Sequence, residues 1–178
     1  MPLPDPADLN SPTVLQPLPV RAWIGLGANL GARQLTLARA LDALRQLPRS
    51  RLIARSRLWR SAPVDADGPD YLNAVAALDT RLTSVELLER MQTIESRFGR
   101  ERPFRNAPRT LDLDLLLFGH ERCISAFLQL PHPRMHQRAF VLAPLIELAP
   151  DIDIPPHGRA RDLLRDLQHQ PCTAIGAA

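Results

Sequence analysis

Two carboxylates lie two residues apart in the segment Leu111–Phe118, which reads LDLDLLLF. This short apolar run favours a β-strand, and residues two apart on a strand point to the same face. Asp112 and Asp114 should therefore project together. Adjacent carboxylates are costly unless they are solvated or share a cation, and hard oxygen ligands of this kind suit Mg²⁺ bound with substrate phosphates. The pair is thus either a metal site or a solvated strand face.

An arginine-rich loop precedes the pair, because residues 99–108 read GRERPFRNAP. The arginines in or beside it are Arg97, Arg100, Arg102, Arg105 and Arg109. Arginine binds phosphate oxygens in pairs and neutralises charge that develops in phosphoryl transfer. The alternative is a charged surface loop without a catalytic role. All 22 basic residues are arginine, and a P-loop needs a lysine on the phosphates. The sequence therefore excludes a Walker-A site.

Further polar and aromatic residues lie on the elements around this loop. His132 stands between two prolines, ahead of Arg138, and both could reach phosphate near a helix N-terminus. Tyr71 is the only tyrosine and would share a strand face with Asn73, and a ring beside a planar amide suits a flat heterocycle. Phe140 could supply a second ring. The alternatives are a structural histidine, a turn-end tyrosine and a core phenylalanine.

A helix begins at Thr83 with a capping box, because Glu86 follows three residues later, and Gly99 ends it. Its expected buried face consists of Val85, Leu88, Met91, Ile94 and Phe98. Gln92 and Glu95 lie three apart and share another face of the same helix. That face either contacts a nucleotide or is solvated.

Hydrophobic periodicity predicts the elements that would position these residues. They are strands at 20–28, 51–61, 71–81 and 111–118, and helices at 32–47, 83–98, 135–148 (interrupted near Pro144) and 159–168. The order β-α-β-β-α-β predicts an α+β, ferredoxin-like core with C-terminal additions, in which helices pack on a mostly antiparallel sheet. Residues 20–178 should form a single domain, preceded by a Pro-rich, flexible extension at residues 1–19.

The composition is that of an ordinary globular protein. The chain has 178 residues, of which 45% are hydrophobic, and no apolar run approaches the roughly 20 residues that span a bilayer. The N-terminus does not read as a secretory signal. The two cysteines, Cys123 and Cys172, match no metal-ligand spacing, so we expect a cytoplasmic protein. A net charge of +3 does not by itself indicate nucleic-acid binding.

From about Ala22 to Pro155 the chain resembles the 6-hydroxymethyl-7,8-dihydropterin pyrophosphokinase family of folate biosynthesis. The matching segments include IGLGANLG (24–31), RSAPV (60–64), PDYLNAV (69–75), GRERPFRNAPRTLDLDLLLFG (99–119) and LPHPRMHQRAFVLAPL (130–145). The last two, found in this order, are highly specific. The resemblance implies that the β,γ-pyrophosphoryl unit of ATP moves to the hydroxymethyl oxygen of the pterin, giving AMP and the pterin diphosphate.

The resemblance also implies a role for each candidate residue. Asp112 and Asp114 would hold two Mg²⁺ ions on the ATP phosphates, and Arg100 and Arg109 would act on the transferring group. The contacts with ATP would come from Gln92, Glu95, Arg102, Leu115, His132 and Arg138. The pterin would lie between Tyr71 and Phe140, with its edge bound by Asn73 and by backbone groups near Ser61 and Val64.

Three other functions fit parts of the sequence. An RNA-binding module would use the arginine loop, but such modules stack bases on several aromatic residues, which are only 4% of this chain. A nucleotidyltransferase with paired aspartates would release pyrophosphate instead of AMP. A non-catalytic binding protein would not need both aspartates and Arg109. We therefore expect ATP and the pterin as partners, without a nucleic acid, a membrane or an obligate protein partner.

Overall fold

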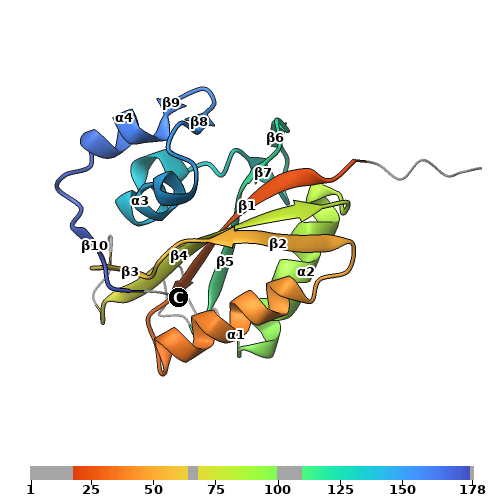
Figure 1. Ribbon diagram of the computed structural model, residues 1–178, viewed down its shortest axis with the longest axis horizontal. Helices are drawn as coiled ribbons and strands as arrows, with labels where there is room; N and C mark the ends of the chain where they lie inside the picture. The colour runs from red at the N-terminus through yellow and green to blue at the C-terminus, as the bar shows by residue number, and fades with distance from the viewer. Residues whose placement is uncertain (1–17, 64–67, 100–109, 177–178) are drawn as a thin grey trace, which may run out of the picture.

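The computed structural model describes residues 18–63, 68–99 and 110–176. Along the chain, its elements are β1 (Val20–Ala28), α1 (Arg33–Arg45), β2 (Ser50–Arg55), β3 (Trp59–Ser61), β4 (Tyr71–Thr80), α2 (Ser84–Arg97), β5 (Asp112–Phe118), β6 (Cys123–Ile124), β7 (Gln129–Leu130), a 3₁₀ helix (Met135–Gln137), α3 (Ala139–Leu148), β8 (Asp153–Ile154), β9 (Gly158–Arg159), α4 (Ala160–Arg165) and β10 (Cys172–Ala174). Figure 1 shows α1 and α2 on one side of the central sheet, with α3 and α4 on the other. Most of the predicted extension at residues 1–19 falls outside the described residues.

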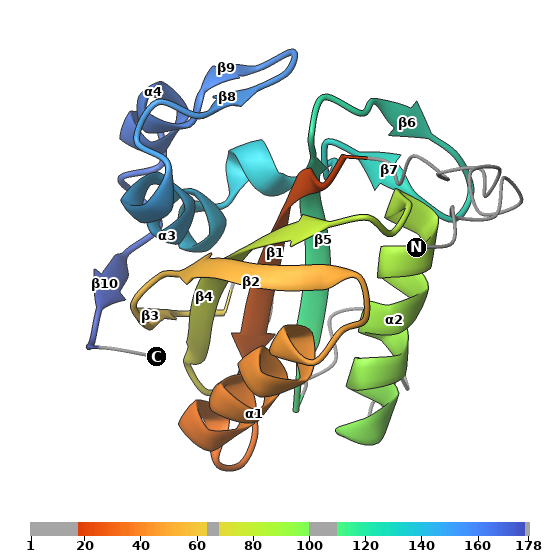
Figure 2. The same ribbon diagram turned by 45° about the vertical axis from the view of Figure 1, so that its right-hand side comes forward.

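The central sheet has six strands, in the order β10-β3-β4-β1-β5, and β2 also pairs with β4. Every pairing within it is antiparallel. The four strands of the predicted core therefore stand in the order β5, β1, β4 and then β2 with β3, joined by α1 and α2. This arrangement confirms the predicted α+β, ferredoxin-like sheet with helices packed on it (Figure 2).

The single strand predicted at 51–61 is two strands in the structure, β2 and β3. The break lies at Ser56, whose hydroxyl accepts a hydrogen bond from the Val75 N–H at 3.0 Å and donates one to the Arg57 carbonyl at 2.8 Å. The Ser56 N–H also donates to the Val75 carbonyl at 2.9 Å, so at this point the hydroxyl replaces the Ser56 carbonyl as the acceptor for Val75. Both pieces still lie beside β4, so the overall topology is the one predicted.

One face of the sheet forms the larger core with α1 and α2. Alternate residues of β1, namely Ala22, Ile24, Leu26 and Ala28, are buried there. The capping box of α2 is confirmed, because Thr83 accepts from the Glu86 N–H and Glu86 accepts from the Thr83 N–H. The predicted buried face of α2 is wrong at Val85, which is 51% exposed. The buried face is formed by Leu87, Met91 and Ile94. Val85 lies two residues before Leu87, so its side chain points to the opposite side of the helix.

The opposite face of the sheet packs against α3. Val75 and Leu116 meet Met135, Leu142 and Leu145 in a second, smaller core. The helix predicted at 135–148 is interrupted at Arg138, where the backbone is extended (φ −125°, ψ 106°), and not at Pro144, which lies inside α3. The last helix is also shorter than predicted, since α4 ends at Arg165.

A bulge allows β5 to serve both cores. The register between β1 and β5 shifts between Trp23 and Ile24, so that Ile24 pairs with Leu115 and Trp23 with Leu117. The extra residue, Leu116, packs against α3 on the same face as Leu117. None of the helices in the described part of the chain combines the length and the hydropathy needed to cross a lipid bilayer.

Candidate active site

The centre of the site is a row of residues that runs across three strands. Gly27 of β1 pairs with Asn73 of β4 on one side and with Asp112 of β5 on the other. The next row on the same face contains Gly25 and its partner Asp114. Directly paired residues of an antiparallel sheet point to the same side. The register therefore brings the amide and both carboxylates to one face, across a floor made of glycine.

The two glycines keep this floor low. A Cβ atom added at Gly27 would lie 3.4 Å from the Asn73 Oδ1 and 4.0 Å from the Tyr71 ring. A Cβ atom added at Gly25 would lie 3.4 Å from the Leu116 side chain. Neither glycine is among the site residues predicted from the sequence. Glycines at alternate positions of a strand are, however, a recognised sign that another group approaches the backbone.

The loop after β7 brings two basic residues to the aspartates. The His132 N–H donates to the Leu116 carbonyl at 2.8 Å, which fixes the loop beside β5. The His132 Nε2 lies 3.8 Å from the Asp114 Oδ2, and the Arg138 Nη1 lies 3.6 Å from the same oxygen. The sequence predicts phosphate contacts for His132 and Arg138, and the structure brings both side chains to the same oxygen of Asp114.

His132 is neutral at physiological pH. Burial, with repulsion from Arg138 and Arg134, lowers the pKa of His132 to about 4, although the charge of Asp112 acts in the opposite direction. Its contact with Asp114 is therefore not an ion pair. The His132 Nδ1 accepts from the Arg134 N–H at 3.3 Å, so the proton of the neutral ring is on Nε2, which faces Asp114.

Arg138 lies between the carboxylates and an aromatic ring. Its guanidinium carbon stands 5.5 Å from the centre of the Phe140 ring, which is within the range of a cation–π contact. The sequence predicts Arg138 inside a helix, but in the structure it is the residue just before α3. This position lets its side chain extend away from the helix axis while Phe140 belongs to the first turn.

Three of the residues predicted to bind the pterin, Ser61, Tyr71 and Asn73, lie together on the other side of Gly27. Ser61 of β3 pairs with Tyr71 of β4, and Trp59 pairs with Asn73. The Asn73 Nδ2 donates to the Ser61 hydroxyl at 3.0 Å, in a buried contact. This bond fixes the orientation of the amide. Its Oδ1 faces Gly27, where a flat ring could reach it.

Gln92 and Glu95 do not share one accessible surface. Gln92 is exposed, whereas Glu95 is 2% exposed and its Oε1 accepts from the Leu113 N–H at 3.0 Å. Glu95 therefore binds the outer edge of β5, the last strand of the sheet. The side chain of Leu115 is buried in the core with α1 and α2, so only its backbone groups are left for a ligand.

Four predicted site residues lie outside the described residues. They are Val64, Arg100, Arg102 and Arg109. The chain enters the described part again at Thr110, two residues before Asp112. The arginine loop is thus joined directly to the strand that carries both aspartates, as the sequence requires.

The donor set suits Mg²⁺. Asp112 and Asp114 offer hard oxygen atoms on one face of β5, and Mg²⁺ is commonly held by one or two carboxylates together with substrate phosphates and water. In the described part of the chain no group of three or more His, Cys, Asp or Glu could hold a metal by itself. A pair of carboxylates that needs the phosphates of a nucleotide to complete the coordination fits both observations.

Comparison with known proteins identifies the chain. Residues 23–150 match the family model described as 7,8-dihydro-6-hydroxymethylpterin-pyrophosphokinase (HPPK). The chain belongs to this family. It is 46% identical over 145 residues to a Pseudomonas aeruginosa protein named 2-amino-4-hydroxy-6-hydroxymethyldihydropteridine pyrophosphokinase, a match that covers 81% of this chain and 90% of that one. A Haemophilus influenzae protein of the same name is 43% identical over 137 residues, covering 76% and 86%.

Solved structures support the fold of this pyrophosphokinase. A crystal structure of a Plasmodium falciparum HPPK-DHPS triple mutant with SDX-DHP superposes with a TM-score of 0.68 at 15% identity. The match covers 86% of this chain and 45% of that chain. The chain therefore spans less than half of this longer protein, and it shares the fold of the matching part.

Proposed function

We propose that the glycine-floored face of the sheet is where this pyrophosphokinase transfers the pyrophosphoryl group of ATP to 6-hydroxymethyl-7,8-dihydropterin, a reaction of folate biosynthesis. The pterin hydroxyl oxygen bonds to the β-phosphorus, the bond from that phosphorus to the α,β-bridging oxygen breaks, and AMP leaves. The hydroxyl proton goes to solvent. The observation that carries the proposal is the row Asn73–Gly27–Asp112, in which an amide and a carboxylate lie on one face of the sheet, on either side of a glycine.

The carboxylates form the phosphate end of the site. Asp112 and Asp114 are the residues that hold Mg²⁺, and we propose two ions. When bound, they offset the negative charge of the phosphates and of the departing oxygen. Phosphoryl transfer is mainly a matter of positioning and charge stabilisation, so the protein groups need little covalent chemistry of their own.

Arg138 and His132 bind the phosphates beside the metal-binding residues. Arg138 carries a permanent charge, and its Nη1 lies 3.6 Å from the Asp114 Oδ2. The neutral His132 directs its Nε2 proton to the same space, so it donates a hydrogen bond to a phosphate oxygen without adding charge. Arg100 and Arg109 act on the transferring group, and Arg102 contacts ATP.

The pterin lies at the other end of the row. Tyr71 and Phe140 supply the rings, and the Asn73 amide, oriented by Ser61, binds the edge of the heterocycle. Backbone groups near Ser61 and Val64 complete the recognition of the ring. Gly27 leaves the space beneath it.

The nucleotide extends to the open edge of β5. The Leu113 N–H points away from β1, toward Glu95. Alternate residues of a strand direct their backbone groups the same way, so the backbone of Leu115 also faces this edge and can bind the adenine or the ribose. Gln92 contacts the nucleotide from the exposed side of α2, whereas the buried Glu95 acts by holding the Leu113 N–H.

An assay of the nucleotide product tests the proposal. Purified protein is incubated with ATP, Mg²⁺ and 6-hydroxymethyl-7,8-dihydropterin, with a control that lacks the pterin. AMP formed only in the presence of the pterin supports the proposal. ADP or free pyrophosphate as the nucleotide-derived product would contradict it, as would a folded protein that binds pterin without turnover.

We also propose that the reaction takes place in the cytoplasm. Cys123 and Cys172 are both free thiols, which is in keeping with a reducing compartment.

A further inference from the structure

The C-terminal strap, residues 169–176, lies beyond the part of the chain that matches the family model, which ends at residue 150. Within the strap, β10 extends the sheet by pairing Cys172 with Ser61 and Thr173 with Arg60. The Ile175 N–H also donates to the Leu58 carbonyl at 2.8 Å. The strap is therefore fixed to the strand that carries Ser61, on the pterin side of the site.

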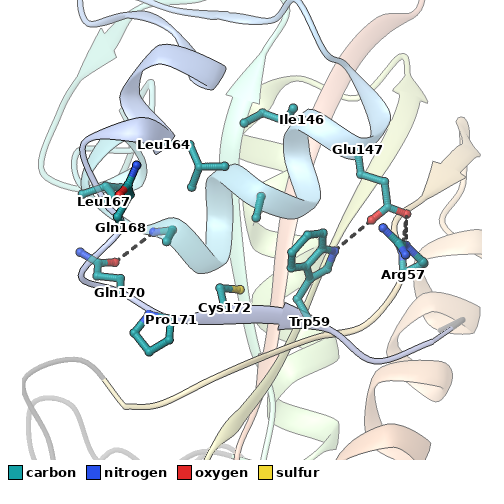
Figure 3. Close-up of a pocket in the computed structure, with 12 residues that line it drawn as sticks. Arg57, Trp59, Ile146, Glu147, Leu164, Leu167, Gln168, Gln170, Pro171 and Cys172 are labelled. Carbon is teal, nitrogen blue, oxygen red and sulfur yellow. Dashed lines mark hydrogen bonds and ion pairs between the residues drawn. The ribbon is translucent and has the colours of Figure 1, made fainter.

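Gln170, near the start of the strap, binds the backbone at the start of α3 and not the sheet. Its Oε1 accepts from the Ala139 N–H at 3.0 Å, and its Nε2 donates to the Gln137 carbonyl at 3.0 Å. Figure 3 shows Gln170 directed toward the start of α3, with Cys172 further along the same segment. One side chain thus holds the backbone on both sides of Arg138.

The bond from the Ala139 N–H to Gln170 does the work of a helix cap. The first N–H groups of a helix lack partners within it, and the N-cap side chain commonly supplies one. In α3 the N-cap residue is Arg138, yet the Ala139 N–H is bound by Gln170. A guanidinium has no hydrogen-bond acceptor, so the Arg138 side chain cannot cap the Ala139 N–H itself; it contacts Asp114 and the Phe140 ring while Gln170 supplies the acceptor.

The strap also borders the pterin side directly. A cavity of about 230 Å³ is lined by Ser61, Phe140, His169, Gln170, Pro171 and Cys172, among others. Gln170 therefore borders the same cavity as Phe140, the residue that we assign to the pterin, and binds the backbone on both sides of Arg138, which we assign to ATP.

We propose that Gln170 is a positioning residue for pyrophosphoryl transfer: it holds the turn at 137–139 so that Arg138 and Phe140 meet ATP and the pterin in register. The proposal rests on the roles that the proposed function gives to these two residues. Displacement of catalytic groups by about 1 Å from a distant change costs up to about 100-fold in rate. A positioning residue acts through this displacement and does not touch either substrate.

The first test compares Gln170→Ala with Gln168→Ala, the same substitution at an exposed position two residues away. We expect kcat/KM to fall about tenfold in Gln170→Ala and to stay within about twofold of wild type in Gln168→Ala. Gln170→Glu keeps an acceptor for the Ala139 N–H and loses the donor to the Gln137 carbonyl, so its kcat/KM should lie between these two. Activity of Gln170→Ala equal to that of the control would overturn the proposal.

A double-mutant cycle separates positioning from a general loss of structure. If Gln170 acts through Arg138, then Gln170→Ala should lower kcat/KM by less than about twofold when Arg138 is already alanine. A full tenfold loss in that background would mean that the two residues act independently, and would sink the idea. Tm, measured for all the variants, identifies any that fail to fold, and for those the comparison is made with Gln170→Glu.

A measurement without substrate keeps this test apart from the test of the reaction itself. Hydrogen exchange of the Ala139 amide should be faster in Gln170→Ala than in Gln168→Ala. If the wild-type protein forms no AMP but exchange at Ala139 is faster in Gln170→Ala, the proposed function is refuted. Gln170 then caps α3 without a role in the reaction. Unchanged exchange at Ala139 would refute the cap, and the positioning role with it.

Discussion

The two faces of the central sheet are built for different purposes. The face toward α1 and α2 presents alternate apolar residues along β1, β4 and β5, and they form one continuous core. The face toward α3 is apolar only around Val75, Leu116 and Leu117. Beyond that cluster it presents Gly25, Gly27 and both aspartates. The same three strands therefore stabilise the fold on one side and carry the proposed ligand-binding residues on the other.

The difference shows why the site can be polar without unfolding the protein. A strand alternates its side chains, so charges on one face do not interrupt packing on the other. The glycines of β1 leave that face without side chains at the proposed site, while Leu26 between them and Ile24 beside them remain buried. Changes on the two faces should thus separate activity from stability.

The largest effect is expected from Asp114→Asn. This isosteric change removes a negative charge from the metal-binding pair, and we expect AMP formation to fall about 10³-fold, because metal ions contribute several kcal/mol to charge stabilisation. Asp79→Asn, on the exposed ion pair with Arg21 at the far end of β4, is the matched control and should retain activity. Near-wild-type turnover of Asp114→Asn would rule out its metal role.

The closed face should respond in stability instead. Ile24→Ala, at a position with no exposed surface, should lower the free energy of unfolding by about 3 kcal/mol, because it leaves a cavity in the core. The kcat of the folded fraction should stay close to wild type. Chemical denaturation measures the first quantity and the AMP assay the second. Ile53→Ala, at a partly exposed position of β2, is the control and should change stability by less than about 0.5 kcal/mol. A kcat loss in Ile24→Ala as large as in Asp114→Asn would break the distinction between the faces.

Gly27→Ala tests the open floor. The added Cβ would make only an ordinary contact with the Asn73 Oδ1 at 3.4 Å, so the fold should be retained. The methyl group would nevertheless occupy the space beneath the substrates, and we expect kcat/KM to fall about tenfold. Gly25→Ala adds the same group two residues away, against the Leu116 side chain, and should cost less activity. Equal losses in both variants would show that the floor at Gly27 has no special role.

The smallest effect concerns the capping box of α2, which supports the closed face. Hydrogen bonds from Thr83, with the nearby charge of Arg49, lower the pKa of Glu86 in the folded state. This stabilisation is fully present above the pKa of the unfolded chain and is lost as the pH falls through the lower, folded pKa. The Tm of wild type should therefore decline more on acidification than that of Glu86→Gln, which keeps the hydrogen-bonding shape.

Glu89→Gln, on the exposed side of the same helix, is the control for this pH dependence and should follow wild type. Thermal unfolding at several pH values, from neutral to strongly acidic, is the measurement. Parallel curves for wild type and Glu86→Gln would contradict the assigned effect of the capping box.

Much of the fold could be predicted because its signals are local. β1 has the predicted bounds, and the capping box at Thr83 starts α2 as expected. The errors came from features set by distant partners. The break between β2 and β3 depends on a bond from Ser56 to β4, and the extended backbone at Arg138 is bound on both sides by Gln170. No local pattern carries either contact.

The candidate site divides in the same way. The chemistry of Asp112 and Asp114 and the family resemblance of their surroundings were legible in the sequence, because they rest on residue types and close spacing. The distance from Asp114 to Arg138, the burial of Glu95 against Leu113 and the neutral state of His132 were not. Each depends on which segments meet across the sheet.

The sequence by itself determined the carboxylate pair and the order of the elements along the chain, since residue spacing and hydrophobic periodicity act over a few residues. The resemblance of its motifs to a known family indicated the reaction class. Only the tertiary structure decided that Gly27 separates Asn73 from Asp112, and that a glutamine near the C-terminus caps the helix that carries Phe140. Strand register and long-range hydrogen bonds join residues 30 to 90 positions apart, and the free energy that selects them belongs to the packed whole rather than to any single segment.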